Sequence, residues 1–399
     1  MTHPSYPVVR LKPKANARAI RHGFPWAYEN EMVIDRRTKG LTPGAIAVLE
    51  DAEREPLGLV TVNPGSKIFC RVLDQDLEAV IDQAWFAKRL TAALAHREQM
   101  YDAPFYRLVH AESDGLPGVV IDRFGDTAVV QPNAAWADQR IEMLAAALAE
   151  VTGISNIVMN GTGRVRGLEG LEEETKVLAG DVSGPIPVSM NGATYMADLL
   201  GGQKTGLFFD QRPNQAFMQR LVGGKRVLDV FSHVGGFGLA ALAAGASETV
   251  AVDSSAPALE LARQGAAAMG AEDRFSSRKG DAFTVLEALA SEGVTYDVVI
   301  CDPPAFAPSK QALERGLRAY ERLARLAAPL VAEGGYLGLC SCSHAADLGK
   351  FRTSSARGIG RAGRQAQLIH TGFAGADHPL MPQLAESGYL KALFFRLQP

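Results

Sequence analysis

Residues 226–238, with the sequence RVLDVFSHVGGFG, decide the fold that we predict for this chain of 399 residues. The apolar run at 227–231 predicts a buried strand, and Gly235, Gly236 and Gly238 follow it in a turn. Glycine lets the backbone come close to a ligand, because no Cβ stands in the way. The helix that follows would aim its unpaired N–H groups at the same point. Strand, turn and helix together predict a nucleotide-type site at the carboxyl end of a parallel strand.

The chain beyond about residue 199 alternates strands with helices, a pattern that is typical of a doubly wound parallel α/β sheet. We predict its strands at residues 227–231, 249–252, 298–301 and 336–340, with a short one before residue 281. We predict its helices at residues 237–244, 256–269, 283–291 and 312–331.

The sequence before that point has a different pattern. Short apolar runs between Pro and Gly turns predict a small β-rich unit. An amphipathic helix at 78–103 and alternating strands and helices follow, and a hairpin turns at Asn191-Gly192. We therefore predict three parts: residues 1–74, a β-rich unit; residues 75–196, a linker helix with an α+β unit; and residues 197–399, the doubly wound unit.

Composition describes a globular protein with 47% hydrophobic and 21% charged residues and a net charge of −3. No apolar run reaches the roughly 18 residues that span a bilayer, and the N-terminus lacks a signal-peptide core, so we expect a cytoplasmic location and no membrane partner. Cys340 and Cys342 are separated by one residue on a predicted strand. Their spacing fits neither a mutual disulfide nor a zinc site, so we expect reduced thiols and no bound metal.

Acidic residues stand at the predicted carboxyl ends of successive strands. Asp253, after the second strand, can accept the ribose hydroxyls of a nucleoside. Asp281 can meet an adenine amino group, and Asp302 ends the strand at 298–301. Asp229 lies inside the first strand, where it is expected to orient the turn. The predicted cofactor-binding residues around this edge are Phe231, Ser232, Gly235, Gly236, Asp253, Ser254, Asp281, Ala282 and Asp302.

Two cofactor classes compete for this frame. A dinucleotide oxidoreductase needs the spacing Gly-x-Gly-x-x-Gly for its pyrophosphate, and residues 233–238, HVGGFG, lack it. S-adenosylmethionine (SAM) carries no phosphate and needs a glycine turn, a ribose carboxylate and an adenine contact. The sequence offers all three, so we predict a SAM-dependent methyltransferase.

The acceptor atom is a separate question with two answers. Residues 302–306, DPPAF, resemble the (Asp/Asn)-Pro-Pro-aromatic motif of enzymes that methylate exocyclic nitrogens, with Ala305 inserted. Residues 340–344, CSCSH, place thiols at the same edge. A thiolate that adds to carbon 6 of a pyrimidine makes carbon 5 nucleophilic, while Asp302 could hold ring N3 and the amino group of cytosine. Buried cysteine is most often a packing residue, so an inert role for both thiols stays open at this point.

Several motifs occur in an order that identifies a family. They are residues 22–26 (HGFPW), 63–71 (NPGSKIFCR), 112–118 (ESDGLPG) with 122–123 (DR), 202–206 (GQKTG) with 210–212 (DQR), the glycine turn, 302–306 (DPPAF), 341–343 (SCS), and 377–379 (DHP) with 389–391 (YLK). With them, nearly the whole chain resembles the ribosomal RNA large subunit methyltransferase I family of SAM-dependent 5-methylcytosine enzymes.

The resemblance implies an N-terminal β-rich PUA domain, a central α+β domain and a C-terminal class I, Rossmann-like methyltransferase domain. The first two would grip ribosomal RNA, while Cys342 of the SCS motif would be the nucleophile and Cys340 a packing residue. Gln203, Lys204, Thr205, Asp210 and Arg212 would cap the cofactor pocket, although Arg212 could equally be a salt-bridge partner of Asp210.

The resemblance leaves three functions in competition: a cytosine-C5 methyltransferase of 23S rRNA, an exocyclic-amine RNA methyltransferase, and an RNA-binding assembly factor that retains SAM. A homodimer is also open. The sequence departs from the family at residues 351–364, which carry four arginines and no acid where relatives have a helix of apolar and acidic residues. Here we expect either a flexible RNA-facing loop or a divergent segment.

Overall fold

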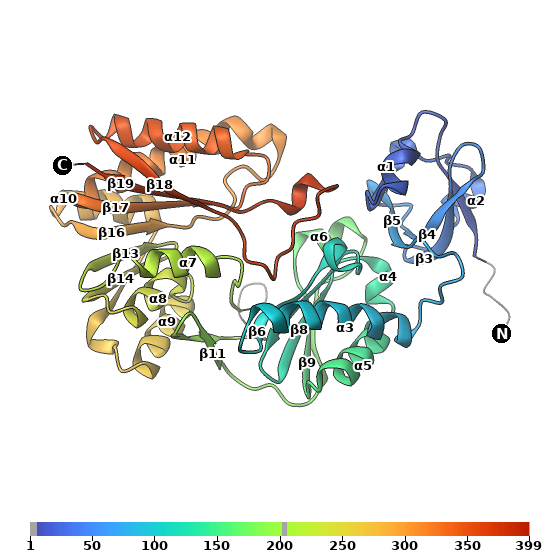
Figure 1. The fold of residues 1–399 in the computed structure, drawn as a ribbon, viewed down its shortest axis with the longest axis horizontal. Coiled ribbons are helices and arrows are strands. Elements are labelled where there is room, and N and C mark those ends of the chain that lie inside the picture. The colour runs from blue at the N-terminus through green and yellow to red at the C-terminus, as the bar shows by residue number, and fades with distance from the viewer. Residues whose placement is uncertain (1–5, 202–205, 399) are drawn as a thin grey trace. The chain divides into compact units, whose positions relative to one another are not determined.

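The structure is a computed structural model that describes residues 6–201 and 206–398 (Figure 1). Its contacts divide the chain into two compact units. The first comprises Met1–Gly184, Leu199–Gly206 and Ala376–Ser387, and the second comprises Pro185–Asp198, Leu207–Gly375 and Gly388–Pro399. The chain therefore passes between the units several times, so neither unit is one uninterrupted stretch.

The first unit contains two five-stranded sheets. The N-terminal sheet has the order β1-β3-β4-β5-β2 and is built from β1 (Val8–Arg10), β2 (Trp26–Tyr28), β3 (Ala45–Glu50), β4 (Pro56–Val62) and β5 (Ile68–Asp74). Two short helices accompany it, α1 (Ala17–Arg21) and α2 (Arg36–Lys39). The short apolar runs predicted in this part form strands, because they bury apolar side chains in one core.

The second sheet of this unit has the order β10-β9-β8-β7-β6. Its strands are β6 (Phe105–His110), β7 (Val119–Phe124), β8 (Thr127–Pro132), β9 (Asn156–Gly161) and β10 (Glu174–Ala179), and its helices are α3 (Gln83–Met100), α4 (Ala135–Asp138), α5 (Ile141–Thr152) and α6 (Arg164–Leu168). Arg71 of β5 forms buried ion pairs with Glu112 at 2.8 Å and Glu169 at 3.0 Å. These pairs tie the two sheets of the unit together.

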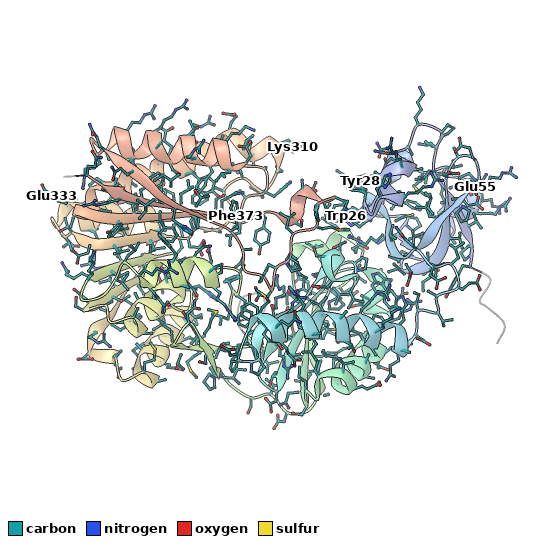
Figure 2. The ribbon with its side chains drawn as sticks, in the orientation of Figure 1. Trp26, Tyr28, Glu55, Lys310, Glu333 and Phe373 are labelled. Atoms are coloured by element: carbon teal, nitrogen blue, oxygen red, sulfur yellow. The ribbon has the colours of Figure 1, made fainter. Side chains whose placement is uncertain are left out.

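The aromatic turn at residues 22–26 leads into β2, where Trp26 and Tyr28 lie next to one another (Figure 2). The indole Nε1 of Trp26 donates to Glu112 Oε1 at 2.8 Å, and the Arg71 guanidinium lies over the ring. Trp26 is thus a partly exposed anchor between β2 and the residues after β6.

The second unit is built on a seven-stranded sheet with the order β15-β14-β13-β16-β17-β19-β18. Its strands are β13 (Arg226–Val230), β14 (Glu248–Asp253), β15 (Phe275–Lys279), β16 (Tyr296–Cys301), β17 (Val331–Ser341), β18 (Ala366–Gly372) and β19 (Lys391–Leu397). Strands β13 to β17 run parallel, and β19 pairs antiparallel with both β17 and β18. The order reverses between β13 and β16, which creates a topological switch point at their carboxyl ends.

Helices cover both faces of this sheet (Figure 1). They are α7 (Arg212–Gln219), α8 (Gly236–Ala243), α9 (Ala256–Ala268), α10 (Ala282–Ser291), α11 (Leu313–Ala327) and α12 (Leu348–Arg361). One apolar core lies beneath α10, α11 and α12, and another lies beneath α7 and α8. The predicted strands and helices of this part are confirmed to within a few residues at each end.

The hairpin predicted at Asn191-Gly192 is also confirmed, as β11 (Ile186–Met190) paired with β12 (Ala193–Ala197). Both turn residues have positive φ, 53° and 74°, as a two-residue turn of this kind requires. The hairpin packs on α8 and α9 and groups with the second unit. The ranges 75–196 and 197–399 remain our proposal for the domain division.

The expectation of a flexible loop at residues 351–364 is wrong, because most of this segment forms α12. Asp347 caps the helix by accepting from the Lys350 N–H at 2.8 Å. Phe351 and Ile359 are buried against the sheet core, while Arg352, Arg357 and Arg361 are exposed. The small residues of this segment therefore serve a close helix contact with α11 rather than mobility.

None of the helices in the described ranges combines the length and the apolar character needed to cross a membrane.

Gly358 provides a test of the α11–α12 contact. A Cβ there would lie 2.3 Å from the Glu321 carbonyl oxygen, so Gly358→Ala should lower the free energy of unfolding by about 1–3 kcal/mol. Gly360 is the matched control in the same helix, since its Cβ would meet no described atom within 4 Å. Gly360→Ala should be neutral or stabilise by about 0.5–1 kcal/mol. Urea unfolding followed by far-ultraviolet circular dichroism measures both, and equal effects would contradict the close contact.

Candidate active site

The turn after β13 has an unusual backbone. Phe231 and His233 have φ of 63° and 50°, a region that side chains other than glycine seldom occupy, and Gly235 has φ 85°. The turn is held by the Ser232 N–H, which donates to Val252 O at 3.0 Å, and by the Gly235 N–H, which donates to Ser232 O at 2.8 Å. Positive φ at non-glycine residues is concentrated at functional sites, where surrounding contacts maintain it.

Asp229 orients this turn, as the sequence predicted. Its carboxylate is buried and accepts from the Gly238 N–H at 2.7 Å, in the first turn of α8. Burial raises the pKa of the Asp229 carboxyl to about 7, although the Gly238 N–H opposes the shift. A second support comes from Tyr195 of β12, whose hydroxyl donates to Gly236 O at 3.0 Å.

Asp253 lies at the end of β14 and is joined to the same turn. Its carboxylate accepts from the His233 N–H at 2.9 Å and from the Ser255 N–H at 2.8 Å. The side chain is partly exposed, and Ser254 beside it is exposed. The carboxylate is therefore fixed in direction at the carboxyl edge of the sheet, next to Phe231–Gly236.

Asp281 and Ala282 begin α10 after β15. Asp281 is exposed and caps the helix, since its Oδ1 accepts from the Thr284 N–H at 3.0 Å. Ala282 is buried beneath it. The capping bond fixes the carboxyl group at this edge and leaves its second oxygen available to a ligand.

Three phenylalanines connect the loops of this edge. The rings of Phe231, Phe283 and Phe306 lie 6.0–6.5 Å apart pairwise, and Phe306 also packs on Tyr320 at 4.9 Å. They come from the ends of β13 and β16 and from the start of α10. The predicted site residues of β13, β15 and β16 are thus brought to one aromatic cluster.

Asp302 and Cys342, the predicted catalytic pair, follow neighbouring strands. The Asp302 N–H continues the ladder of β16 by donating to Val230 O at 3.1 Å. Cys342 follows β17, and its Sγ lies 3.9 Å from Pro303 O. The thiol therefore lies against the DPPAF segment.

Two serines flanking Cys342 fix its direction. Ser341 Oγ and Ser343 Oγ both share hydrogen bonds with the Tyr320 hydroxyl, at 2.9 and 2.8 Å, and Ser343 Oγ also accepts from the Ala307 N–H. Both serines are buried. Because side chains alternate along an extended chain, the residue between them must point the other way. We call Ser341, Ser343 and Tyr320 the serine–tyrosine clamp.

The other thiols are in different surroundings. Cys70, Cys301 and Cys340 are buried, and burial raises the pKa of each of them. Cys342 is partly exposed. Since a thiolate is the reactive form, the three buried thiols are held in the unreactive one.

Asp210 and Arg212 lie on the segment that precedes and begins α7. Tyr389 donates to Asp210 Oδ2 at 2.7 Å, and the Arg212 guanidinium lies over the Phe209 ring. The ring of Phe208 lies 5.2 Å from that of His233, which joins this segment to the glycine turn. Gln203, Lys204 and Thr205, also predicted to cap the site, lie outside the described residues.

Sequence reasoning found the SCS and YLK motifs but missed Tyr320 of the clamp and the role of Lys391, which lies at the start of β19 with its Nζ 2.7 Å from Ser343 O. No sequence pattern pointed to Tyr320, because a single tyrosine in a long helix is common. A pattern did point to Lys391: it is a charged residue that opens the otherwise apolar run KALFF.

The residues present fit SAM. Ser232 Oγ is buried in the turn without a hydrogen-bond partner among the described residues, so it can bind a polar group of a ligand. Asp253 and Asp281 offer carboxylates to hydroxyl and amino groups, and the turn is not built for a pyrophosphate. Within the described ranges, no cluster of three or more His, Cys, Asp or Glu side chains is arranged to hold a metal ion.

Comparison with known proteins agrees with this assignment. A family model described as S-adenosylmethionine-dependent methyltransferase matches residues 167–396, and one described as a PUA-like domain matches residues 9–75. A protein of Photobacterium profundum, named ribosomal RNA large subunit methyltransferase I, is 37% identical over 95% of this chain and 96% of its own. These matches confirm the predicted fold class and the cofactor.

Solved structures show the same fold. One, described as a SAM-dependent methyltransferase of Streptococcus mutans, has a TM-score of 0.81 at 20% identity and covers 98% of this chain and 100% of its own. Another, determined with S-adenosylhomocysteine, has a TM-score of 0.82 at 20% identity and covers 98% and 99%.

The buried Asp229 predicts a pH dependence of stability. Because its pKa is raised in the folded state, the folded protein retains a proton that the unfolded chain has lost, and this stabilisation disappears as the pH rises through about 7. Between pH 5 and pH 8 the wild type should lose on the order of 2 kcal/mol relative to Asp229→Asn, which stays neutral and still accepts from Gly238.

The measurement is the free energy of unfolding by urea at several pH values. Circular dichroism is suitable because the tryptophans, Trp26, Trp85 and Trp136, all belong to the first unit. Asp273→Asn, at an exposed acid, is the control and should run parallel to the wild type. Parallel curves for Asp229→Asn as well would show that the buried carboxyl does not titrate in this range.

Proposed function

The chain belongs to the ribosomal RNA large subunit methyltransferase I family of SAM-dependent methyltransferases, and we propose that it methylates carbon 5 of a cytosine in 23S ribosomal RNA through a covalent bond to Cys342. The name of the relatives supports ribosomal RNA as the substrate class. The PUA-like match supports an RNA-binding role for the first unit. We propose a cytoplasmic location, where this RNA is found, and leave a homodimer open.

The residues of the carboxyl edge would hold the cofactor. In this proposal, Asp253 binds the ribose hydroxyls, and Asp281 with Ala282 binds the adenine. Ser232, Gly235 and Gly236 bind the methionine end, with Asp210 and Arg212 over it. SAM, when bound, supplies an electrophilic methyl group on sulfur. The role of the protein is to make carbon 5 of cytosine a nucleophile next to it.

Cys342 performs this activation in the proposed mechanism. Its thiolate forms an Sγ–C6 bond, the C5–C6 π bond breaks, and the electron pair passes to C5 and towards N3, where Asp302 donates or shares a proton. Carbon 5 then takes the methyl group. A base removes the C5 proton, that electron pair restores the C5–C6 double bond, the C6–Sγ bond breaks to release the thiolate, and N3 returns its proton to Asp302.

The observation that carries the proposal is the position of the Cys342 thiol. Its Sγ lies 3.9 Å from Pro303 O, beside Asp302, while the clamp on Ser341 and Ser343 directs it away from the core. The three other thiols are buried. Cys342 is therefore the cysteine that combines exposure with the carboxyl edge, as a nucleophile requires.

The exocyclic-amine alternative needs the aromatic ring of residues 302–306 to stack on the base. Phe306 instead packs on Phe283 and Tyr320 within the aromatic cluster. This occupation of the ring disfavours that alternative. The glycine turn, the carboxylates of Asp253 and Asp281 and the thiol of Cys342 support a catalytic role over the assembly-factor alternative.

Cys342→Ala should abolish methyl transfer, with a loss on the order of 10³-fold or more, while the affinity for SAM stays unchanged. The assay follows the methyl group of labelled SAM into 23S rRNA from cells that lack the protein, and mass mapping locates the product on the base. Cys340→Ala is the matched control: it removes a buried thiol two positions away and should keep activity within a few-fold.

Nearly normal turnover by Cys342→Ala would favour amine methylation instead. Tight binding of rRNA by the wild type, without transfer to any of it, would favour the assembly factor.

A further inference from the structure

Lys391 is a buried cation beside the proposed nucleophile. It begins β19, pairs with Ser341 in the ladder with β17, and has 4% of its surface exposed. Its Nζ donates to Ser343 O at 2.7 Å. The residues on both sides of Cys342 are thus in contact with Lys391, one through the backbone ladder and the other through the ammonium group.

Burying an ammonium group is unfavourable unless an anion or several acceptors compensate it. Burial lowers the pKa of Lys391 to about 8, and a negative charge at Cys342 or Asp347 acts in the opposite direction. The Ser343 carbonyl oxygen alone does not require a charged partner, because the neutral side-chain amide of a glutamine could donate to it. A thiolate at Cys342 would offset the cost of burying the ammonium group.

Three further titratable groups of the described residues near the thiol, Tyr320, Asp302 and Asp347, carry no positive charge. Tyr320 of α11 remains protonated, because burial raises the pKa of its hydroxyl. Asp302 follows β16 and begins the DPPAF segment, against which the thiol lies, and Asp347 caps α12. Carboxylates near a thiol would oppose its ionisation. Among these described groups, Lys391 carries the positive charge that favours ionisation of the thiol.

We infer that Lys391 is a positioning residue for the covalent step, whose ammonium group stabilises the thiolate of Cys342. The inference rests on the proposed function. A nearby cation lowers the pKa of a thiol, and its effect is larger in a site shielded from water. The same charge stabilises the sulfur when the C6–Sγ bond breaks. One residue thereby assists both formation and release of the adduct, while its bond to Ser343 O holds the loop that carries the thiol.

The test is the pKa of Cys342, measured without RNA or SAM. Iodoacetamide alkylates thiolates, and peptide mass spectrometry gives the rate at Cys342 alone from pH 6 to pH 10. Lys391→Gln removes the charge and keeps a donor for Ser343 O. We expect a midpoint below the ordinary thiol value of about 8.5 in the wild type. In Lys391→Gln it should rise by one unit or more, so that alkylation at pH 7 slows at least about tenfold.

Two further variants make the result specific. Lys350→Gln removes an exposed lysine that pairs with Asp347, and should leave the midpoint unchanged. Lys391→Arg keeps a charge and should retain a midpoint close to that of the wild type. The acid limb of kcat/KM should move with the alkylation midpoint in Lys391→Gln, which a purely structural lysine would not cause.

Equal midpoints for wild type and Lys391→Gln would overturn the inference, as would a shift of equal size in Lys391→Arg. If Lys391→Gln unfolds, as circular dichroism would show, the decision falls to the wild type and Lys391→Arg: an ordinary wild-type midpoint overturns the inference, and a low one in both upholds it. Failure of the proposed function has a different signature, an active Cys342→Ala variant, which alkylation does not measure.

Discussion

The candidate site depends on one buried hydrogen bond, from the Gly238 N–H to the Asp229 carboxylate at 2.7 Å. It joins the end of β13 to the first turn of α8 and fixes the length and shape of the turn between them. Positive φ at Phe231 and His233 persists because both ends of the turn are held in this way. The His233 N–H in turn donates to Asp253. Burying a carboxylate costs free energy, so the residue that fixes the turn also lowers the stability of the sheet that carries it.

The thiol side of the site follows a different principle, the alternation of side chains along extended chain. Ser341 and Ser343 point inward to one Tyr320 hydroxyl, so Cys342 between them points to Pro303. Cys340 is buried in the sheet core instead. The two cysteines thus have different surroundings, because Cys340 lies within β17 whereas Cys342 follows its last residue, Ser341.

Local pattern was enough to predict much of this architecture. The strand at 226–230, the glycine turn and the acidic strand ends were found because parallel strands bring their carboxyl ends to one edge. Features that depend on packing between distant segments could not be found. For residues 351–364 the sequence leaves open a flexible loop or a divergent segment, yet most of them form α12, where Gly358 is required by the close approach of α11. Tyr320 and Lys391 acquire their roles only when α11 and β19 are placed beside β17.

The chain path adds a constraint that strand order alone does not reveal. Residues 376–387 lie between β18 and β19 in sequence but belong to the first unit, where buried Asp377 accepts from the Arg107 N–H and the Tyr101 hydroxyl. Tyr389, just beyond this segment, donates to Asp210 in the second unit, and Lys391 follows. The lysine beside the thiol is therefore only a few residues of backbone away from a segment anchored in the other unit.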